Sequence, residues 1–180
     1  DKVNQELKPE RLWKKEGAEL IRDKCQGKTG QVSEESKPSK EVCPLLYDLT
    51  SLQRDANGRF GFSAKTTLGL AQALYEKHKV LTYPRTDSRA LPEDYIATVK
   101  DTLQTFEHTA YDKFAQQILA SNWVTPNKRI FNNAKISDHF AIIPTALNPT
   151  KLNEAEAKLY DLVTKRFLAI FYPAAEFLIT

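Results

Sequence analysis

The 180-residue sequence contains no methionine and only two cysteines, Cys25 and Cys43. Two cysteines are too few for a disulfide scaffold, and they lack the paired spacing of a zinc site. No apolar run approaches the ~18 residues that a membrane-spanning helix requires, and no charged-then-apolar leader opens the chain. We therefore expect free thiols in a reducing compartment and no membrane partner. Because the first residue is not Met, we also expect a piece of a longer protein.

The composition is that of an ordinary globular domain, with 41% hydrophobic and 27% charged residues. The net charge of +3 is spread unevenly. Residues 48–90 carry seven Lys or Arg against four Asp or Glu, and residues 121–151 carry four against one. Residues 91–120 between them carry two against five. The two basic stretches favour an anionic partner such as a nucleic acid, although a solvated surface has the same composition.

Hydrophobic periodicity predicts an α+β fold that is mostly α. Residues 28–48 are typical of an extended arm or edge strand, with a flexible linker as the alternative, and residues 176–180 of a strand that leaves the domain. The predicted helices cover residues 10–25, 50–58, 63–77, 92–106, 111–120 and 153–172.

Capping residues and apolar stripes support these helices. Thr50 opens a candidate capping box, Ser63 is a good N-cap, and Asn153 has Glu at the third position after it. Pro92 suits the first turn of its helix. Within the helices, the positions expected to be apolar and buried are Leu12, Trp13, Leu20, Ile21, Leu68, Ala71, Leu74, Tyr75, Ile96, Val99, Leu103, Phe106, Phe114, Ile118, Leu159, Leu162, Val163, Phe167 and Ile170.

One stretch combines a phenol and a guanidinium on either side of a proline. Pro84 pushes Tyr83 into an extended conformation, in which residues two apart point to the same side. We therefore expect Tyr83 and Arg85 to share one face at close range. A phenol can attack a phosphodiester, and arginine can hold a phosphate with two parallel hydrogen bonds and offset transition-state charge. The alternative is a structural tyrosine beside a solvated arginine.

Three segments, taken in order, resemble motifs of type IA DNA topoisomerases. Residues 82–89 read TYPRTDSR, which is similar to the active-site tyrosine motif of that family. Upstream, the segments LQR (52–54), RFGFSAK (59–65) and AQALYE (71–76) resemble the helical run before that tyrosine. Downstream, ISDHFAIIPT (136–145) resembles the histidine motif. The sequences of these motifs are more similar to the topoisomerase III branch, although Phe140 stands where many members of that branch have a second histidine.

The resemblance implies a domain organisation and an activity. Residues 1–48 would belong to a β arch domain, residues 49–173 to the helical domain with the active-site tyrosine, and residues 174–180 to a strand that returns to the arch. Full-length relatives cut and reseal single DNA strands through a 5′-phosphotyrosine intermediate. Tyr83 would be the nucleophile, Arg85 would bind the scissile phosphate, and His139 would contact DNA near the cut. Asp138 is a candidate to orient His139.

The family also uses magnesium, held by acidic residues that include an Asp-x-Asp element in a separate N-terminal domain. This sequence contains no Asp-x-Asp, so we expect no metal site here and no cleavage by these residues alone. The resemblance further implies single-stranded DNA and the rest of the same protein as partners, a helicase as a candidate partner, and a cytoplasmic, nucleoid-associated location.

Three further basic residues, Arg59, Lys128 and Arg129, are candidate DNA contacts, and solvated surface charge is the alternative for each. Other classes of function also stay open. The chain could be a non-catalytic DNA-binding or scaffold module, or a structural protein that does not meet DNA. A tyrosine recombinase is disfavoured, because no His-x-x-Arg element is present and Tyr83 lies in mid-chain.

Overall fold

The computed structural model describes residues 12, 14–31 and 33–179, and it divides the chain into two compact units. One unit is Pro38–Phe177, which we call the helical unit. The other contains the described residues outside that range. The predicted α+β class with mostly α structure is confirmed. The boundaries predicted at 48/49 and 173/174 stay predictions.

The smaller unit contains helix α1, Lys15–Cys25. The predicted start of this helix at residue 10, and Trp13, lie outside the described residues. The expected burial of Leu12, Leu20 and Ile21 is wrong, because 60%, 72% and 51% of these side chains are exposed. Gly27 adopts φ +74 just after the helix, so the predicted stop is confirmed.

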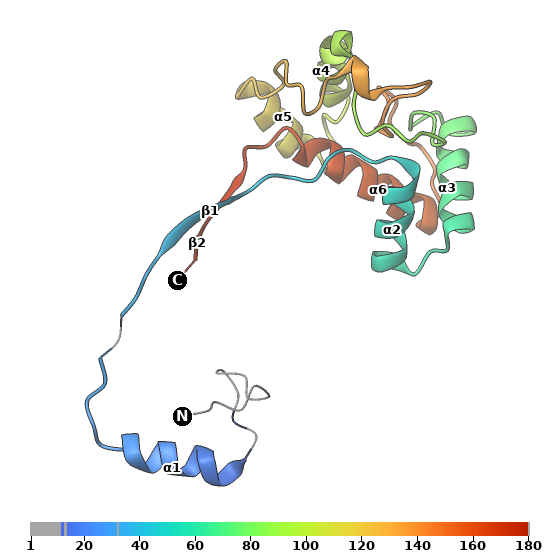
Figure 1. Ribbon diagram of the computed structural model, residues 1–180. Coiled ribbons are helices and arrows are strands. Elements are labelled where there is room, and N and C mark those ends of the chain that lie inside the picture. The colour runs from blue at the N-terminus through green and yellow to red at the C-terminus, as the bar shows by residue number, and fades with distance from the viewer. Residues whose placement is uncertain (1–11, 13, 32, 180) are drawn as a thin grey trace. The chain divides into compact units, whose positions relative to one another are not determined.

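A two-stranded sheet pairs the strand that precedes the helices of the helical unit with the strand that follows them. Strand β1, Lys37–Glu41, leads toward the helices and pairs with β2, Ala175–Ile179, which leads away from them (Figure 1). An ion pair of 2.6 Å between Lys40 and Glu176 adds to the pairing. The predicted extended arm and closing strand are confirmed within the described residues, and residues 32 and 180 lie outside them.

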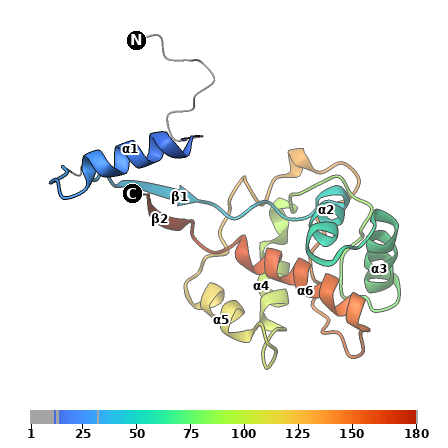
Figure 2. The ribbon, with the colours of Figure 1, turned by 90° about the horizontal axis from the view of Figure 1, so that it is seen from below.

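Helix α6 is the central element of the helical unit (Figures 1 and 2). Helices α2 and α3 pack on it and on each other, whereas α5 packs both on it and on α4. In chain order the elements are α2 Leu49–Phe60, α3 Ala64–Glu76, the 3₁₀ turn η1 Glu93–Tyr95, α4 Ile96–Gln104, α5 Asp112–Ala120, the 3₁₀ turn η2 Asn133–Lys135 and α6 Glu154–Ala169. None of the helices in the described part of the chain is long and apolar enough to cross a bilayer.

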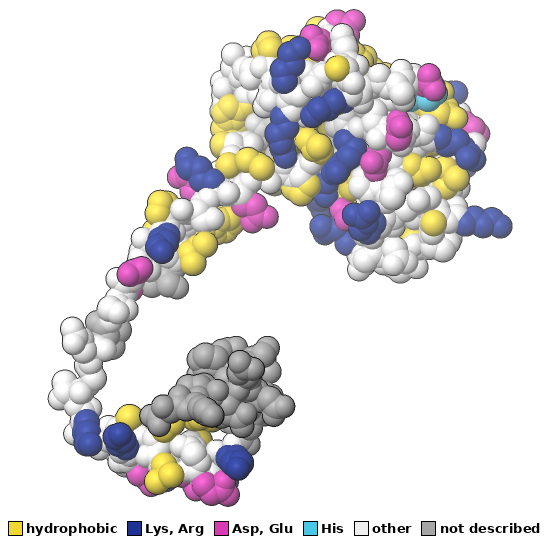
Figure 3. Space-filling view, viewed as in Figure 1, with side chains coloured by type: hydrophobic (Ala, Val, Ile, Leu, Met, Phe, Trp, Pro, Cys, Tyr) yellow, Lys and Arg dark blue, Asp and Glu magenta, His cyan; other side chains and the backbone are white. Residues whose placement is uncertain are grey.

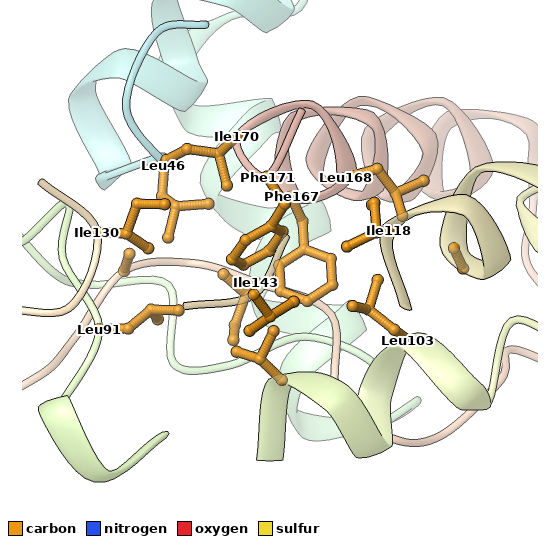
Figure 4. Packing of buried hydrophobic residues seen from close by; sticks show 14 of the residues in the cluster. Leu46, Leu91, Leu103, Ile118, Ile130, Ile143, Phe167, Leu168, Ile170 and Phe171 are labelled. Carbon is orange, nitrogen blue, oxygen red and sulfur yellow. The ribbon is translucent and has the colours of Figure 1, made fainter. Parts of the chain in front are cut away.

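Two buried clusters meet along α6. Leu159 and Val163, in the first part of α6, pack in a cluster with Leu52 and Leu74 of α2 and α3. Farther along, Phe167 lies in a second cluster with residues of α4 and α5 (Figure 4). The predicted inward face of α6 is confirmed, because Leu159, Leu162, Val163, Phe167 and Ile170 are all buried.

Side-chain hydrogen bonds cap the N-termini of α2, α3 and α6. Ser63 accepts a hydrogen bond from the Thr66 amide, and Asn153 forms a capping box with Glu156, as predicted. The prediction at Thr50 is wrong: Asp48 caps α2, since its carboxylate accepts from the Ser51 amide at 2.7 Å. A carboxylate is the stronger acceptor at this position.

Two further details differ from the sequence predictions. Helix α2 continues past Gly58 to Phe60 and ends at Gly61, which adopts φ +70, a conformation that glycine reaches without steric cost. Phe114 was predicted to be buried, and this is wrong because 49% of it is exposed. The buried stripe of α5 is formed by Ala115 and Ile118, and the ring of Phe114 lies one helical position off that stripe.

Three arginines anchor the segment that joins β1 to α2. Arg129 donates to the carbonyl oxygen of Cys43, and Arg89 donates through Nε to that of Leu46 at 2.9 Å. Arg166 donates to the carbonyl oxygen of Leu45 at 2.9 Å. In the same segment, burial raises the pKa of the Cys43 thiol. The backbone oxygens of residues 43–46, which we call the arm root, are therefore held by arginines from three distant parts of the helical unit.

Candidate functional site

Two non-helical segments build the site, one after α3 and one before α6. Leu81 and Pro144 form an antiparallel bridge. The Thr82 amide donates to the carbonyl oxygen of Ile143 at 3.0 Å, and the Thr145 amide donates to that of Val80 at 3.0 Å. These contacts bring the motif at residues 82–89 beside the motif at residues 136–145.

The Thr82 side chain strengthens this junction. Its hydroxyl donates to the carbonyl oxygen of Ala141 at 3.0 Å and accepts from the Ile143 amide at 2.9 Å. A hydroxyl can fill both roles at once. Since Ala141 and Ile143 are buried, Thr82 satisfies two backbone groups that water does not reach.

The residues after Arg85 hold the histidine segment from the other side. The Thr86 hydroxyl donates to the carbonyl oxygen of His139 at 2.9 Å and accepts from the Ser88 amide at 3.0 Å. The Ser137 hydroxyl donates to Asp87 at 3.2 Å. These short polar side chains therefore hold the segment after the tyrosine against residues 137–139.

Tyr83 is half-buried and lies against two other rings. Its ring centroid is 4.3 Å from that of His139 and 5.4 Å from that of Tyr75. Among the described residues, no hydrogen bond engages the Tyr83 hydroxyl. The structure thus brings together the predicted nucleophile and the predicted histidine, which are far apart in sequence.

Arg85 is exposed and reaches helix α3. Its Nη2 donates to Gln72 Oε1 at 3.5 Å, and the Gln72 amide nitrogen donates to Glu76 at 3.0 Å. In the part of the chain that is described, no hydrogen bond joins Arg85 to Tyr83. A chain of contacts instead links Arg85 to Gln72 and Glu76, and the expected close approach of Arg85 to Tyr83 stays a prediction. Sequence reasoning missed Gln72, although it lies four residues before Glu76 on one helix face.

His139 is exposed, and its neighbours hold it through the backbone. No hydrogen bond joins Asp138 to His139 among the described side chains, so the predicted orienting contact is not formed here. Phe140, the next residue, packs its ring 4.9 Å from that of Tyr95. Ring contact with Tyr83 is thus the interaction that places the imidazole.

The other predicted DNA contacts lie in different surroundings. Lys128 pairs with Glu93 at 2.7 Å, and this hydrogen bond holds the pKa of Glu93 below its usual value. The Arg129 guanidinium is engaged by the arm root, at Cys43. Arg59 is exposed in the last turn of α2. None of the three is linked to Tyr83 by a hydrogen bond or ion pair within the described range.

The surface of the helical unit carries both signs of charge. In the view of Figure 3, Lys and Arg side chains gather in a band across the unit, with acidic side chains between them. No cluster of three or more His, Cys, Asp or Glu side chains in residues 12, 14–31 and 33–179 is placed to hold a metal ion. The described residues therefore do not fit a magnesium site.

Comparison with known proteins points to one family. A family profile described as DNA topoisomerase matches residues 1–180. The chain is 51% identical over 155 residues to DNA topoisomerase 3 of Bacillus subtilis, with 84% of this chain and 21% of the relative covered. It is 50% identical to DNA topoisomerase 3 of Bacillus licheniformis, with the same coverage.

A solved structure shows the same fold. Full-length topoisomerase I of Thermotoga maritima superposes with a TM-score of 0.58 at 24% identity, over 96% of this chain and 27% of that one. The chain spans about a fifth of the length of the curated relatives it matches.

Proposed function

The chain belongs to the DNA topoisomerase family, of type IA, and from that premise we propose that a full-length protein carrying it cuts and reseals single DNA strands. Such a reaction changes DNA topology without net hydrolysis. The observation that carries the proposal is the position of Tyr83. It lies 4.3 Å from the ring of His139, where two motifs of the sequence are tied together through backbone and hydroxyl groups.

The proposed reaction is a transesterification at phosphorus. Tyr83 Oη attacks the phosphodiester, the bond from phosphorus to the 3′ oxygen breaks, and the tyrosine becomes joined to the 5′ phosphate. The proton of the phenol leaves, and the 3′ oxygen gains one to become a hydroxyl. One phosphate ester replaces another, so little free energy is lost and the reverse reaction reseals the strand without ATP.

The neighbouring side chains have supporting roles in this proposal. Arg85 is exposed, and the 3.5 Å distance from its Nη2 to Gln72 Oε1 is long for a hydrogen bond. The guanidinium is therefore available to turn toward a phosphate. His139 can donate a hydrogen bond to a phosphate oxygen near the cut. Gln72 and Glu76 limit the directions in which Arg85 can move.

We also propose that the catalytic magnesium and its carboxylates belong to a part of the full-length protein outside this sequence. The strands β1 and β2 would belong to the arch domain of such a protein. Its partners would be single-stranded DNA, its own remaining domains and a helicase. Since the relatives named DNA topoisomerase 3 come from bacteria, we expect it at the nucleoid in the cytoplasm.

The test is the substitution Tyr83→Phe in the full-length protein, with Tyr95→Phe as the matched control. Tyr95 is another half-buried tyrosine, and it packs on Phe140 rather than on His139. Single-stranded oligonucleotides labelled at the 3′ or the 5′ end are incubated with enzyme and magnesium and then denatured. The 3′ label should stay on wild-type protein and on Tyr95→Phe, and Tyr83→Phe should form no adduct. Adducts with Tyr83→Phe, or adducts that retain the 5′ label, would refute the proposal, and the absence of any adduct with the wild type would instead favour a non-catalytic DNA-binding module.

A further inference from the structure

An open hollow lies beside Tyr83, between the end of α3 and the segment that carries Phe140 and Thr145. It has a volume of about 380 Å³, and most of its lining is apolar. Its walls include the rings of Tyr75 and Phe140, together with Lys79, Thr145 and Tyr83 itself. The hollow therefore offers aromatic faces and one cation next to the hydroxyl that would attack DNA.

Lys79 occupies a backbone position that favours glycine. It has φ +60, in the left-handed region, and follows α3. The Val80 amide donates to the carbonyl oxygen of Leu74 at 2.9 Å, so a residue in the left-handed conformation follows the helix at a place where glycine is common. The Thr145 hydroxyl holds the conformation by donating to the carbonyl oxygen of Lys79 at 2.7 Å. A side chain kept at a strained position on the rim of a hollow indicates a use for that side chain.

The ammonium group of Lys79 points over the hollow. Its Nζ lies 6.0 Å from the centroid of the Tyr75 ring, which is half-buried. No acidic side chain pairs with Lys79 among the described residues. Lys128 and Lys158, by comparison, each pair with a glutamate. Lys79 is thus free to meet an anion that enters beside Tyr83.

We propose that this hollow binds one nucleotide of the strand that Tyr83 attacks, next to the scissile phosphate. The base lies against the aromatic walls of Tyr75 and Phe140, and the phosphate of that nucleotide contacts the Lys79 ammonium. Base stacking on aromatic rings and a lysine on the backbone are the two contacts by which single strands are held without strict sequence preference. Because the hollow is continuous with Tyr83, a nucleotide bound there fixes the position of the neighbouring phosphodiester. The inference rests on the proposed function and adds a subsite to it.

The phosphate contact is tested by Lys79→Gly in the full-length protein, with Lys77→Ala as control. Lys77 is exposed, lies two residues away at the end of α3, and loses the same charge. Glycine fits φ +60, so Lys79→Gly should fold at least as well as the wild type in thermal melts. The slope of log affinity for a single-stranded oligonucleotide against log salt should fall by about 0.7 in Lys79→Gly, which is the loss of one phosphate contact. The slope for Lys77→Ala should not change. Equal slopes for the two variants would overturn the proposal.

The base contact is tested by an abasic scan of the same oligonucleotide. Removal of one base near the cleavage position should weaken binding to the wild type about tenfold. The same removal should weaken binding to Phe140→Leu by a clearly smaller factor, about threefold, because this variant keeps an apolar side chain on Tyr95 and the Tyr75 wall but lacks one of the two rings. If no abasic position distinguishes wild type from Phe140→Leu, the subsite is refuted. The adduct test with Tyr83→Phe decides the proposed function separately, since it does not depend on Lys79 or Phe140.

Discussion

Replacing Thr82 by valine should loosen the junction that brings Tyr83 to His139. The Thr82 hydroxyl satisfies the carbonyl oxygen of Ala141 and the amide of Ile143, at 3.0 and 2.9 Å. Valine has nearly the same shape and makes neither bond. A buried backbone group without a partner costs about 1–3 kcal/mol, and the added methyl group recovers about 0.8 kcal/mol. We expect a net loss of about 2 kcal/mol in the free energy of unfolding.

The matched control is Thr82→Ser, which keeps the hydroxyl and removes only a methyl group. At about 2–4 °C per kcal/mol for a chain of this size, Thr82→Val should melt about 4–8 °C below the wild type. Urea unfolding followed by circular dichroism gives the free energy directly. The reasoning is wrong if Thr82→Val is as stable as Thr82→Ser. Because Tyr83 follows Thr82 directly, adduct formation by the full-length Thr82→Val protein should also slow more than that of Thr82→Ser.

Two other substitutions test the scaffold. Arg166→Ala should lower the free energy of unfolding, measured by urea titration, by about 2 kcal/mol, because the ion pair of Arg166 with Asp55 at 2.9 Å has little access to solvent. The control Lys165→Ala should change that free energy by less than about 0.5 kcal/mol, because the ion pair of Lys165 with Asp161 is exposed. The backbone amide of Asn153 holds the pKa of Glu156 below its usual 4.5, so the stability that ionised Glu156 contributes is present above pH 4.5 and is lost as the pH falls through the lower folded pKa. Glu156→Gln keeps the cap, and its urea midpoint should therefore depend less on pH below 4.5; an unchanged pH dependence would contradict this assignment.

Local chemistry explains why much of the helical unit could be predicted. Ser63 and Asn153 cap their helices through hydrogen bonds to residues three positions later, and that spacing is visible in the sequence. The inward stripe of α6 follows from the same helical period. The choice of Thr50 over Asp48 failed because two capping patterns overlapped, and the sequence gives no measure of which acceptor the Ser51 amide reaches.

The site residues also divide into those that the sequence motifs predict and those whose contacts depend on packing. Motif resemblance was enough to select Tyr83 and His139, and the structure brings their rings together. The motif resemblance could not predict the contact of Arg85 with Gln72, because a long exposed side chain selects its partner only after α3 has packed. Composition likewise could not separate Lys128, which pairs with Glu93, from Lys79, which faces the hollow.

The part of the site that escaped prediction is the part made by strain and tertiary contact. A lysine at φ +60 has no sequence signature, since left-handed backbone is foreseen only where glycine or asparagine stands. Its conformation depends on Thr145, which lies 66 residues away and reaches the Lys79 carbonyl oxygen only after residues 136–145 have docked. The same docking brings His139 to Tyr83. One set of long-range contacts therefore builds the ring contact at the tyrosine and the cation on the adjacent rim, so a substitution that weakens the docking should impair both together.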